Sequence, residues 1–134
     1  MKLSKQARAC SLSPMRKFHP YAVAAKQKGR EIFHLNIGQP DIETPPAFFD
    51  ALKSFEAKVL EYAPSPGLPV LIEAIRNYYK KIGVEYEASD ILITTGGSEA
   101  LQILLNCILD NGSEVLIPEP FYPNYCTFVT SAGG

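Results

Sequence analysis

The sequence is poor in the residues that build metal sites and disulfide frameworks. It has two histidines, His19 and His34, and three cysteines, none of them in a C-x-x-C spacing. An odd cysteine count without that spacing argues against a disulfide framework or a zinc site, and it suits a reducing cytosol. We therefore expect no metal and predict a cytoplasmic location. Cys107 lies within an apolar helical pattern, which predicts a small core residue.

Long apolar runs and an excess of one charge are also missing. No stretch approaches the roughly 20 apolar residues of a membrane span, and no apolar core follows Lys2, Lys5 and Arg8, as a signal peptide requires. The formal net charge is -1, which gives no reason to expect nucleic acid or an anionic membrane as a partner. A chain of 134 residues with 46% hydrophobic residues is enough for one globular domain. Because residues 131–134 directly follow an expected helix, we interpret the chain as a piece of a longer protein.

The most informative stretch is residues 90–101. A short uncharged apolar run predicts a strand buried on both faces, Gly96 and Gly97 interrupt it, and a helical apolar spacing follows. Ser98 and Glu99 lie in the first helical turn, where backbone N–H groups are unpaired and the helix dipole is positive. A strand that leads through glycines into a helix can bind an anion, most often phosphate. An ordinary turn that uses glycine only to reverse direction is the alternative.

The rest of the chain is expected to alternate helices with strands. The expected helices span residues 21–28, about 44–58, 69–82, 98–108 and 123–132, and the expected strands span residues 32–37, 91–94 and 114–117. The order strand, helix, strand, helix from residue 90 onward indicates an α/β domain with a parallel sheet. Thr44 is expected to cap its helix, because two prolines follow it. Residues 1–19 lack periodicity and are expected to form an arm.

Two nucleotide-binding motifs are absent. A P-loop needs G-x-x-x-x-G-K-[ST], and no lysine follows Gly96 or Gly97 in that way. A dinucleotide fingerprint needs G-x-G-x-x-G, which residues 96–100 do not supply. Nucleotide binding is therefore disfavoured.

Four segments match the motifs of one enzyme family, in order and with the family's spacing. They are residues 35–41 (N-x-G-x-P-D), residues 62–75 (Y-x-x-x-x-G-x-P-x-L-R-x-A-I), residues 94–100 (a cofactor-phosphate loop) and residues 112–123 (G-D-E-V-x-x-P-x-P-x-[WY]). On these motifs the chain resembles the class I, fold type I aminotransferases, which depend on pyridoxal 5′-phosphate. It departs from the pattern at Ile72, where arginine is usual, and at Ser113, where aspartate is usual. Four ordered matches are a specific signal, whereas any one of them could arise by chance.

The resemblance implies which residues bind the cofactor phosphate. Gly97, Ser98 and Glu99 would supply backbone N–H groups to it, and the Ser98 hydroxyl would be a further donor. This agrees with the helix-terminus argument made from the residues alone.

The resemblance also implies roles for three residues outside that loop. Tyr122 would stack on the pyridine ring, although from the residues alone it reads as a core or turn aromatic. Tyr62 would reach the phosphate of the cofactor in the partner subunit of a homodimer, although it reads as a solvent-facing loop residue. The Gly38 backbone would lie against the substrate carboxylate, although it reads as part of a plain turn.

The fold that the resemblance implies is α/β. The chain would be the N-terminal part of the fold type I aminotransferase large domain, a mostly parallel sheet flanked by helices. Residues 1–44 would form an N-terminal arm and a small-domain segment, and residues 45–134 the first part of the pyridoxal-phosphate-binding large domain, which is incomplete here. Strands joined through a helix usually lie side by side, but the family separates residues 91–94 from residues 114–117 by later strands. We therefore expect two strands with buried faces that share no hydrogen-bond ladder.

The activity that the resemblance implies is transfer of an amino group between an amino acid and a 2-oxo acid. No catalytic residue is expected in this chain, because the Schiff-base lysine of the family lies beyond residue 134, and the fragment alone should be inactive. A pyridoxal-phosphate lyase or synthase of the same fold is an alternative. Another is a non-catalytic cofactor-binding regulator, but such regulators carry a DNA-binding domain in front, and residues 1–19 are too short for one.

Overall fold

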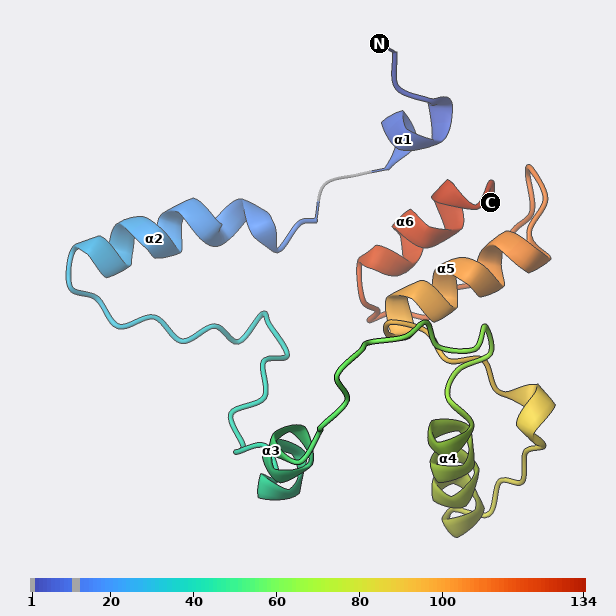
Figure 1. Cartoon of the computed structure of the whole chain (residues 1–134). Coiled ribbons are helices and arrows are strands. Elements are labelled where there is room, and N and C mark those ends of the chain that lie inside the picture. The colour runs from blue at the N-terminus through green and yellow to red at the C-terminus, as the bar shows by residue number, and fades with distance from the viewer. Residues whose placement is uncertain (1, 11–12) are drawn as a thin grey trace.

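The computed structural model describes residues 2–10 and 13–134. In these ranges the chain forms helices joined by long irregular segments, and it contains no strand. The α-helices are α1 (Lys5–Ala9), α2 (His19–Gln27), α3 (Pro46–Lys53), α4 (Pro69–Lys81), α5 (Gly97–Ile108) and α6 (Asn124–Ser131), and the 3₁₀ turns are η1 (Arg16–Phe18) and η2 (Ala88–Asp90). Helices α5 and α6 pack side by side with α1 against α6, while α2 and α3 stand away from them (Figure 1).

Three helices confirm the sequence-based expectations closely. Helix α4 begins at Pro69, which fills an N-terminal position where its missing N–H costs nothing, and Gly83 follows its end with a φ of +83°. Helices α5 and α6 also lie where the apolar spacing predicts them.

Two helical predictions were wrong in part. Helix α3 ends at Lys53, five residues earlier than expected, and its N-cap is Pro45, so Thr44 does not cap it. Helix α1 lies in the segment that was expected to be an arm without structure. Its first turn is stabilised by the Ser4 hydroxyl, which accepts a hydrogen bond from the Ala7 N–H at 3.0 Å.

The prediction of strands is not met in this chain. Residues 32–37, 91–94 and 114–117 are irregular or extended segments without ladder partners in the described part of the chain. A strand forms only when a neighbouring strand satisfies its backbone N–H and C=O groups, and none of the described residues forms such a neighbour. No backbone hydrogen bond joins residues 91–94 to residues 114–117 among the described residues. Since neither segment forms a strand there, the expected separation of two strands in a sheet stays a prediction.

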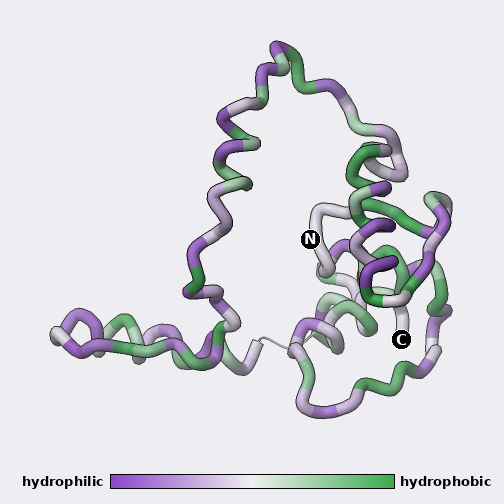
Figure 2. The backbone as a smooth tube through the Cα atoms, turned by 90° about the horizontal axis from the view of Figure 1, so that it is seen from below, coloured by the Kyte–Doolittle hydropathy of each residue, from purple (hydrophilic) through white to green (hydrophobic). Residues whose placement is uncertain are grey.

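The expectation that these segments have buried faces was wrong. Leu92 is 56% exposed and Leu116 is 94% exposed. Among the described residues, Ile72 is the one buried hydrophobic side chain, although the family motif usually has arginine there. Cys107, expected in the core, is exposed. The tube view shows apolar stretches along open segments that no second layer covers (Figure 2).

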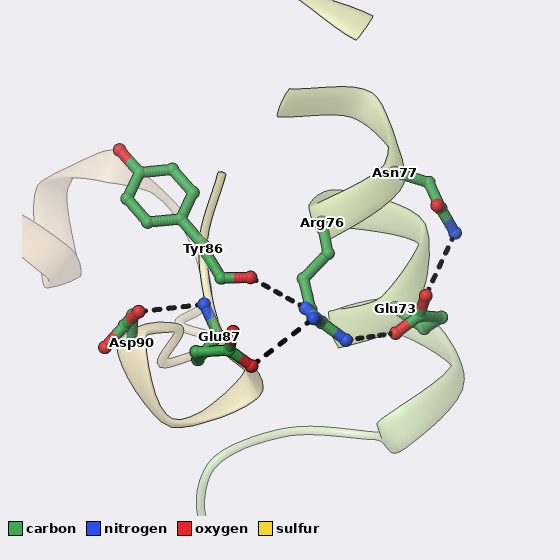
Figure 3. A network of polar contacts seen from close by, with 6 residues as sticks. All are labelled: Glu73, Arg76, Asn77, Tyr86, Glu87 and Asp90. Carbon is green, nitrogen blue, oxygen red and sulfur yellow. Dashed lines mark hydrogen bonds and ion pairs between the residues drawn. The ribbon is translucent and has the colours of Figure 1, made fainter. Parts of the chain in front are cut away.

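A polar network joins α4 to the segment that leads into residues 91–95 (Figure 3). Arg76 donates from Nε to the Tyr86 carbonyl at 2.8 Å, and it pairs with Glu73 at 2.8 Å and with Glu87 at 3.5 Å. Asp90 accepts the Glu87 N–H at 2.8 Å, which closes the turn of η2. Residues 91–95 therefore start from a segment that is anchored on α4.

A second contact holds the same segment further along. The Ile93 N–H donates to the Pro66 carbonyl at 2.9 Å. Gly67 is buried with a φ of +119°, and a Cβ placed on it would lie 2.1 Å from Cγ1 of Ile93. Only glycine tolerates both this backbone conformation and this approach. The loop before α4 thus fixes the position of Ile93, which lies three residues before Gly96.

None of the helices within residues 2–10 and 13–134 has the length and apolar character needed to cross a membrane.

Candidate functional site

The candidate site is the turn that enters α5. Gly96 is the N-cap residue and has an extended backbone, with a φ of 163°. The first helical bond runs from the Ala100 N–H to the Gly96 carbonyl at 3.1 Å. The Thr94 hydroxyl donates to the same carbonyl at 3.0 Å. Residues on both sides of the glycines therefore fix the orientation of this peptide.

The first turn of α5 offers donors to an anion. Within the part of the chain that the structure describes, the backbone N–H groups of Gly97, Ser98 and Glu99 have no hydrogen-bond acceptor. A Cβ added at Gly96 or Gly97 would meet nothing within 4 Å, so the space beside the turn is open. Free N–H groups at the positive end of a helix dipole favour a phosphate. The residues present fit the phosphate of the expected cofactor.

The Glu99 side chain folds back over this turn. Its Oε2 accepts the Thr95 N–H at 2.5 Å. Hydrogen bonds from Thr95, the backbone N–H first and the side chain second, hold the pKa of the Glu99 carboxyl below its usual value. An exposed carboxyl is ionised at neutral pH in any case, so these hydrogen bonds decide where the carboxylate lies and not whether it is charged. This side-chain contact of Glu99 was not predicted from the sequence, although an acid at the third helical position, as in a capping box, was a signal for it.

Tyr122 lies two residues before the first residue of α6. Its hydroxyl accepts a hydrogen bond from Asn124 Nδ2 at 2.8 Å, and its ring meets the Tyr125 ring edge-on, with centroids 5.7 Å apart. Tyr122 also lines an apolar groove of about 600 Å³ between α5, residues 115–118 and α6, together with Leu101 of α5. Tyr122 therefore lies beside the helix whose first turn carries the free N–H groups. Its role in stacking on the cofactor stays a prediction.

The two remaining candidates are not brought to this turn. Tyr62 is fully exposed and takes part in no hydrogen bond or aromatic contact recorded within the described ranges. Gly38 lies in an irregular exposed segment, where an added Cβ would meet nothing within 4 Å. Their roles stay predictions.

Comparison with known proteins places the chain in a family. The family model for aminotransferase class I and II matches residues 30–134. The aspartate aminotransferase of Geobacillus stearothermophilus is 34% identical over 136 residues, which cover 100% of this chain and 35% of that protein. The probable N-acetyl-LL-diaminopimelate aminotransferase of Bacillus subtilis is 35% identical and is covered to 33%. The chain therefore spans about a third of the length of the curated relatives it matches.

Solved structures agree with the sequence comparison. The aspartate aminotransferase of Rhizobium meliloti superposes on 100% of this chain with a TM-score of 0.85 and 29% identity, and 34% of its own length is covered. A single mutant of the Thermus thermophilus aspartate aminotransferase gives the same TM-score with 31% identity and 36% coverage. These enzymes also explain the fit of the α5 turn to a phosphate, because the family depends on pyridoxal 5′-phosphate. The chain belongs to the class I and II aminotransferases.

Proposed function

We propose that this chain is the N-terminal third of an enzyme that transfers an amino group between an amino acid and a 2-oxo acid with pyridoxal 5′-phosphate. The observation that carries the proposal is the α5 turn, which presents three free N–H groups to open space within a segment that matches the family over residues 30–134. Below, "the full-length protein" means a polypeptide of about the length of these relatives, of which this chain would form about a third.

The cofactor would be held at two points by residues of this chain. The backbone N–H groups of Gly97, Ser98 and Glu99 would bind its phosphate, with the Ser98 hydroxyl as a further donor, and the Tyr122 ring would stack on its pyridine. When bound, the cofactor acts as an electron sink, and the protein orients it and the substrate. The Gly38 backbone would lie against the substrate carboxylate, where a side chain would not fit. The Schiff-base lysine would come from beyond residue 134.

In the full-length protein, residues 91–94 and 114–117 would become strands of a mostly parallel sheet. Support comes from the TM-score of 0.85 against structures about three times as long, and from the exposed Leu92 and Leu116, whose apolar side chains need cover. Residues 1–44 would form the arm and a small-domain segment, and residues 45–134 the first part of the large domain. The three unpaired cysteines favour a cytoplasmic enzyme.

Amino transfer can be tested directly with the full-length protein. Incubated with pyridoxal phosphate, an amino acid and a 2-oxo acid, it is expected to produce the matching 2-oxo acid and amino acid in equal amounts, as chromatography of the products would show. The 134-residue chain alone is the control, and it is expected to be inactive because the lysine is missing. Release of ammonia without a new amino acid would indicate a lyase and contradict the proposal.

Tyr62 provides a test of the assembly. If its hydroxyl reaches the cofactor phosphate of a partner subunit, Tyr62→Phe should weaken pyridoxal phosphate binding about tenfold, since a hydrogen bond to a charged group is lost. The homodimer should persist in light scattering. Tyr78→Phe, on an exposed side chain of α4, is the matched control and should leave binding unchanged. A full-length monomer with full activity would rule this role out.

A further inference from the structure

We propose that the Glu99 side chain is a positioning residue, which holds the phosphate-binding turn in its binding shape by accepting the Thr95 N–H. The proposal rests on the proposed function of this turn. It gives Glu99 a second role that differs from the donation of its backbone N–H, because the side chain acts on the residue before the glycines.

The turn needs such a constraint because its central residues are glycines. Gly96 and Gly97 have the widest backbone freedom of any residue type, and an added Cβ would meet no neighbour at either position. Gly96 is the N-cap but has no side chain with which to cap the helix. Two side-chain contacts therefore restrain the turn, one from the Thr94 hydroxyl to the Gly96 carbonyl and one from Thr95 to Glu99.

The geometry separates this role from ordinary helix stabilisation. An acid in the first helical turn stabilises a helix through the dipole wherever its carboxylate lies. Here the carboxylate accepts the N–H of Thr95, which lies outside α5. Hydrogen bonds to ionised acceptors are shorter and stronger than neutral ones. The contact thus joins Glu99 of α5 to Thr95, which precedes the two glycines. The turn between these two residues carries the N–H groups that would bind the phosphate.

The charge of Glu99 works against the phosphate, and this opposition makes the proposal testable. A carboxylate near a phosphate repels it, so loss of the charge alone favours the anion. Loss of the hydrogen bond loosens the turn and disfavours the anion. Glu99→Gln removes the charge but keeps an acceptor oxygen, whereas Glu99→Ala removes both. The difference between the two variants isolates the hydrogen bond.

The experiment measures ligand binding to the full-length protein freed of cofactor. Dissociation constants of pyridoxal 5′-phosphate and of pyridoxal, which lacks the phosphate, are obtained by fluorescence titration for the wild type, Glu99→Gln and Glu99→Ala. Glu99→Gln is expected to bind pyridoxal phosphate at least as tightly as the wild type, and Glu99→Ala about tenfold more weakly than Glu99→Gln. Pyridoxal binding is expected to be the same in all three. Glu85→Ala, which removes an exposed acid outside the turn, should change neither ligand.

The outcomes separate this proposal from the proposed function. If the wild type binds pyridoxal as tightly as pyridoxal phosphate, the turn does not bind the phosphate, and the proposed function of the turn is wrong. If the wild type prefers pyridoxal phosphate but Glu99→Gln and Glu99→Ala bind it with equal dissociation constants, the turn binds the phosphate and the Glu99 side chain does not position it. This result overturns the role of Glu99 only. Equal weakening of both ligands by Glu99→Ala points to a general loss of structure and also overturns it. Amide exchange at Thr95 in the wild type gives a second readout, with protection expected and unprotected exchange contradicting the contact.

Discussion

Ser98→Asp in the full-length enzyme is expected to weaken pyridoxal phosphate binding roughly 100-fold. Ser98 lies in the first turn of α5, between the N–H groups of Gly97 and Glu99. An aspartate there adds a negative charge beside a phosphate dianion. At a separation of about 5 Å and an effective dielectric constant of about 20, each pair of unit charges repels by roughly 3 kcal/mol, and solvent screening at this exposed turn reduces the net effect.

The control for this charge effect is Ser98→Asn, which has nearly the same shape as aspartate but no charge. It loses the serine hydroxyl, so a loss of only a few-fold is expected. Both variants are titrated with pyridoxal phosphate, and with pyridoxal as the ligand that lacks the phosphate. Equal dissociation constants for Ser98→Asp and the wild type would remove Ser98 from the site.

Gly67→Ala is expected to destabilise the full-length protein by at least about 3 kcal/mol, as overpacking and backbone strain combine. The new Cβ would lie 2.1 Å from Cγ1 and 2.6 Å from Cβ of Ile93, both of which are near the backbone and cannot swing aside. The overlap is relieved only if the loop that contains Gly67 moves away from Ile93, and this movement breaks the hydrogen bond from the Ile93 N–H to the Pro66 carbonyl. Because Ile93 leads into the glycine turn, pyridoxal phosphate binding should weaken as well.

The matched control is Gly83→Ala. Gly83 also has a positive φ, +83°, but an added Cβ there would meet nothing within 4 Å. The expected cost is therefore the backbone strain alone, about 1 to 2 kcal/mol. Urea denaturation of both variants gives the free energies of unfolding. Equal losses for the two substitutions would show that the contact between Gly67 and Ile93 contributes nothing.

The sequence by itself determined helices α4, α5 and α6 and the free N–H groups at the start of α5, because these depend on local interactions. Helices α4, α5 and α6 close their hydrogen bonds within a few residues, so the apolar spacing, prolines and glycines near residues 69, 96 and 123 were enough to place them. The free N–H groups of Gly97 and Ser98 follow from the start of α5 alone. Four motifs along the chain then led to the family that the comparisons show.

Only the tertiary structure decided which side chains are buried and where extended segments find partners. Residues 91–94 read as a buried strand, yet the backbone partner of Ile93 is Pro66, in a loop before α4. Ile72 is buried while Leu92, Leu116 and Cys107 are exposed. Local sequence cannot specify such contacts, since a strand or a core position exists only when a distant segment lies against it. For the same reason, the clash that makes Gly67 necessary is visible only once Ile93 is beside it.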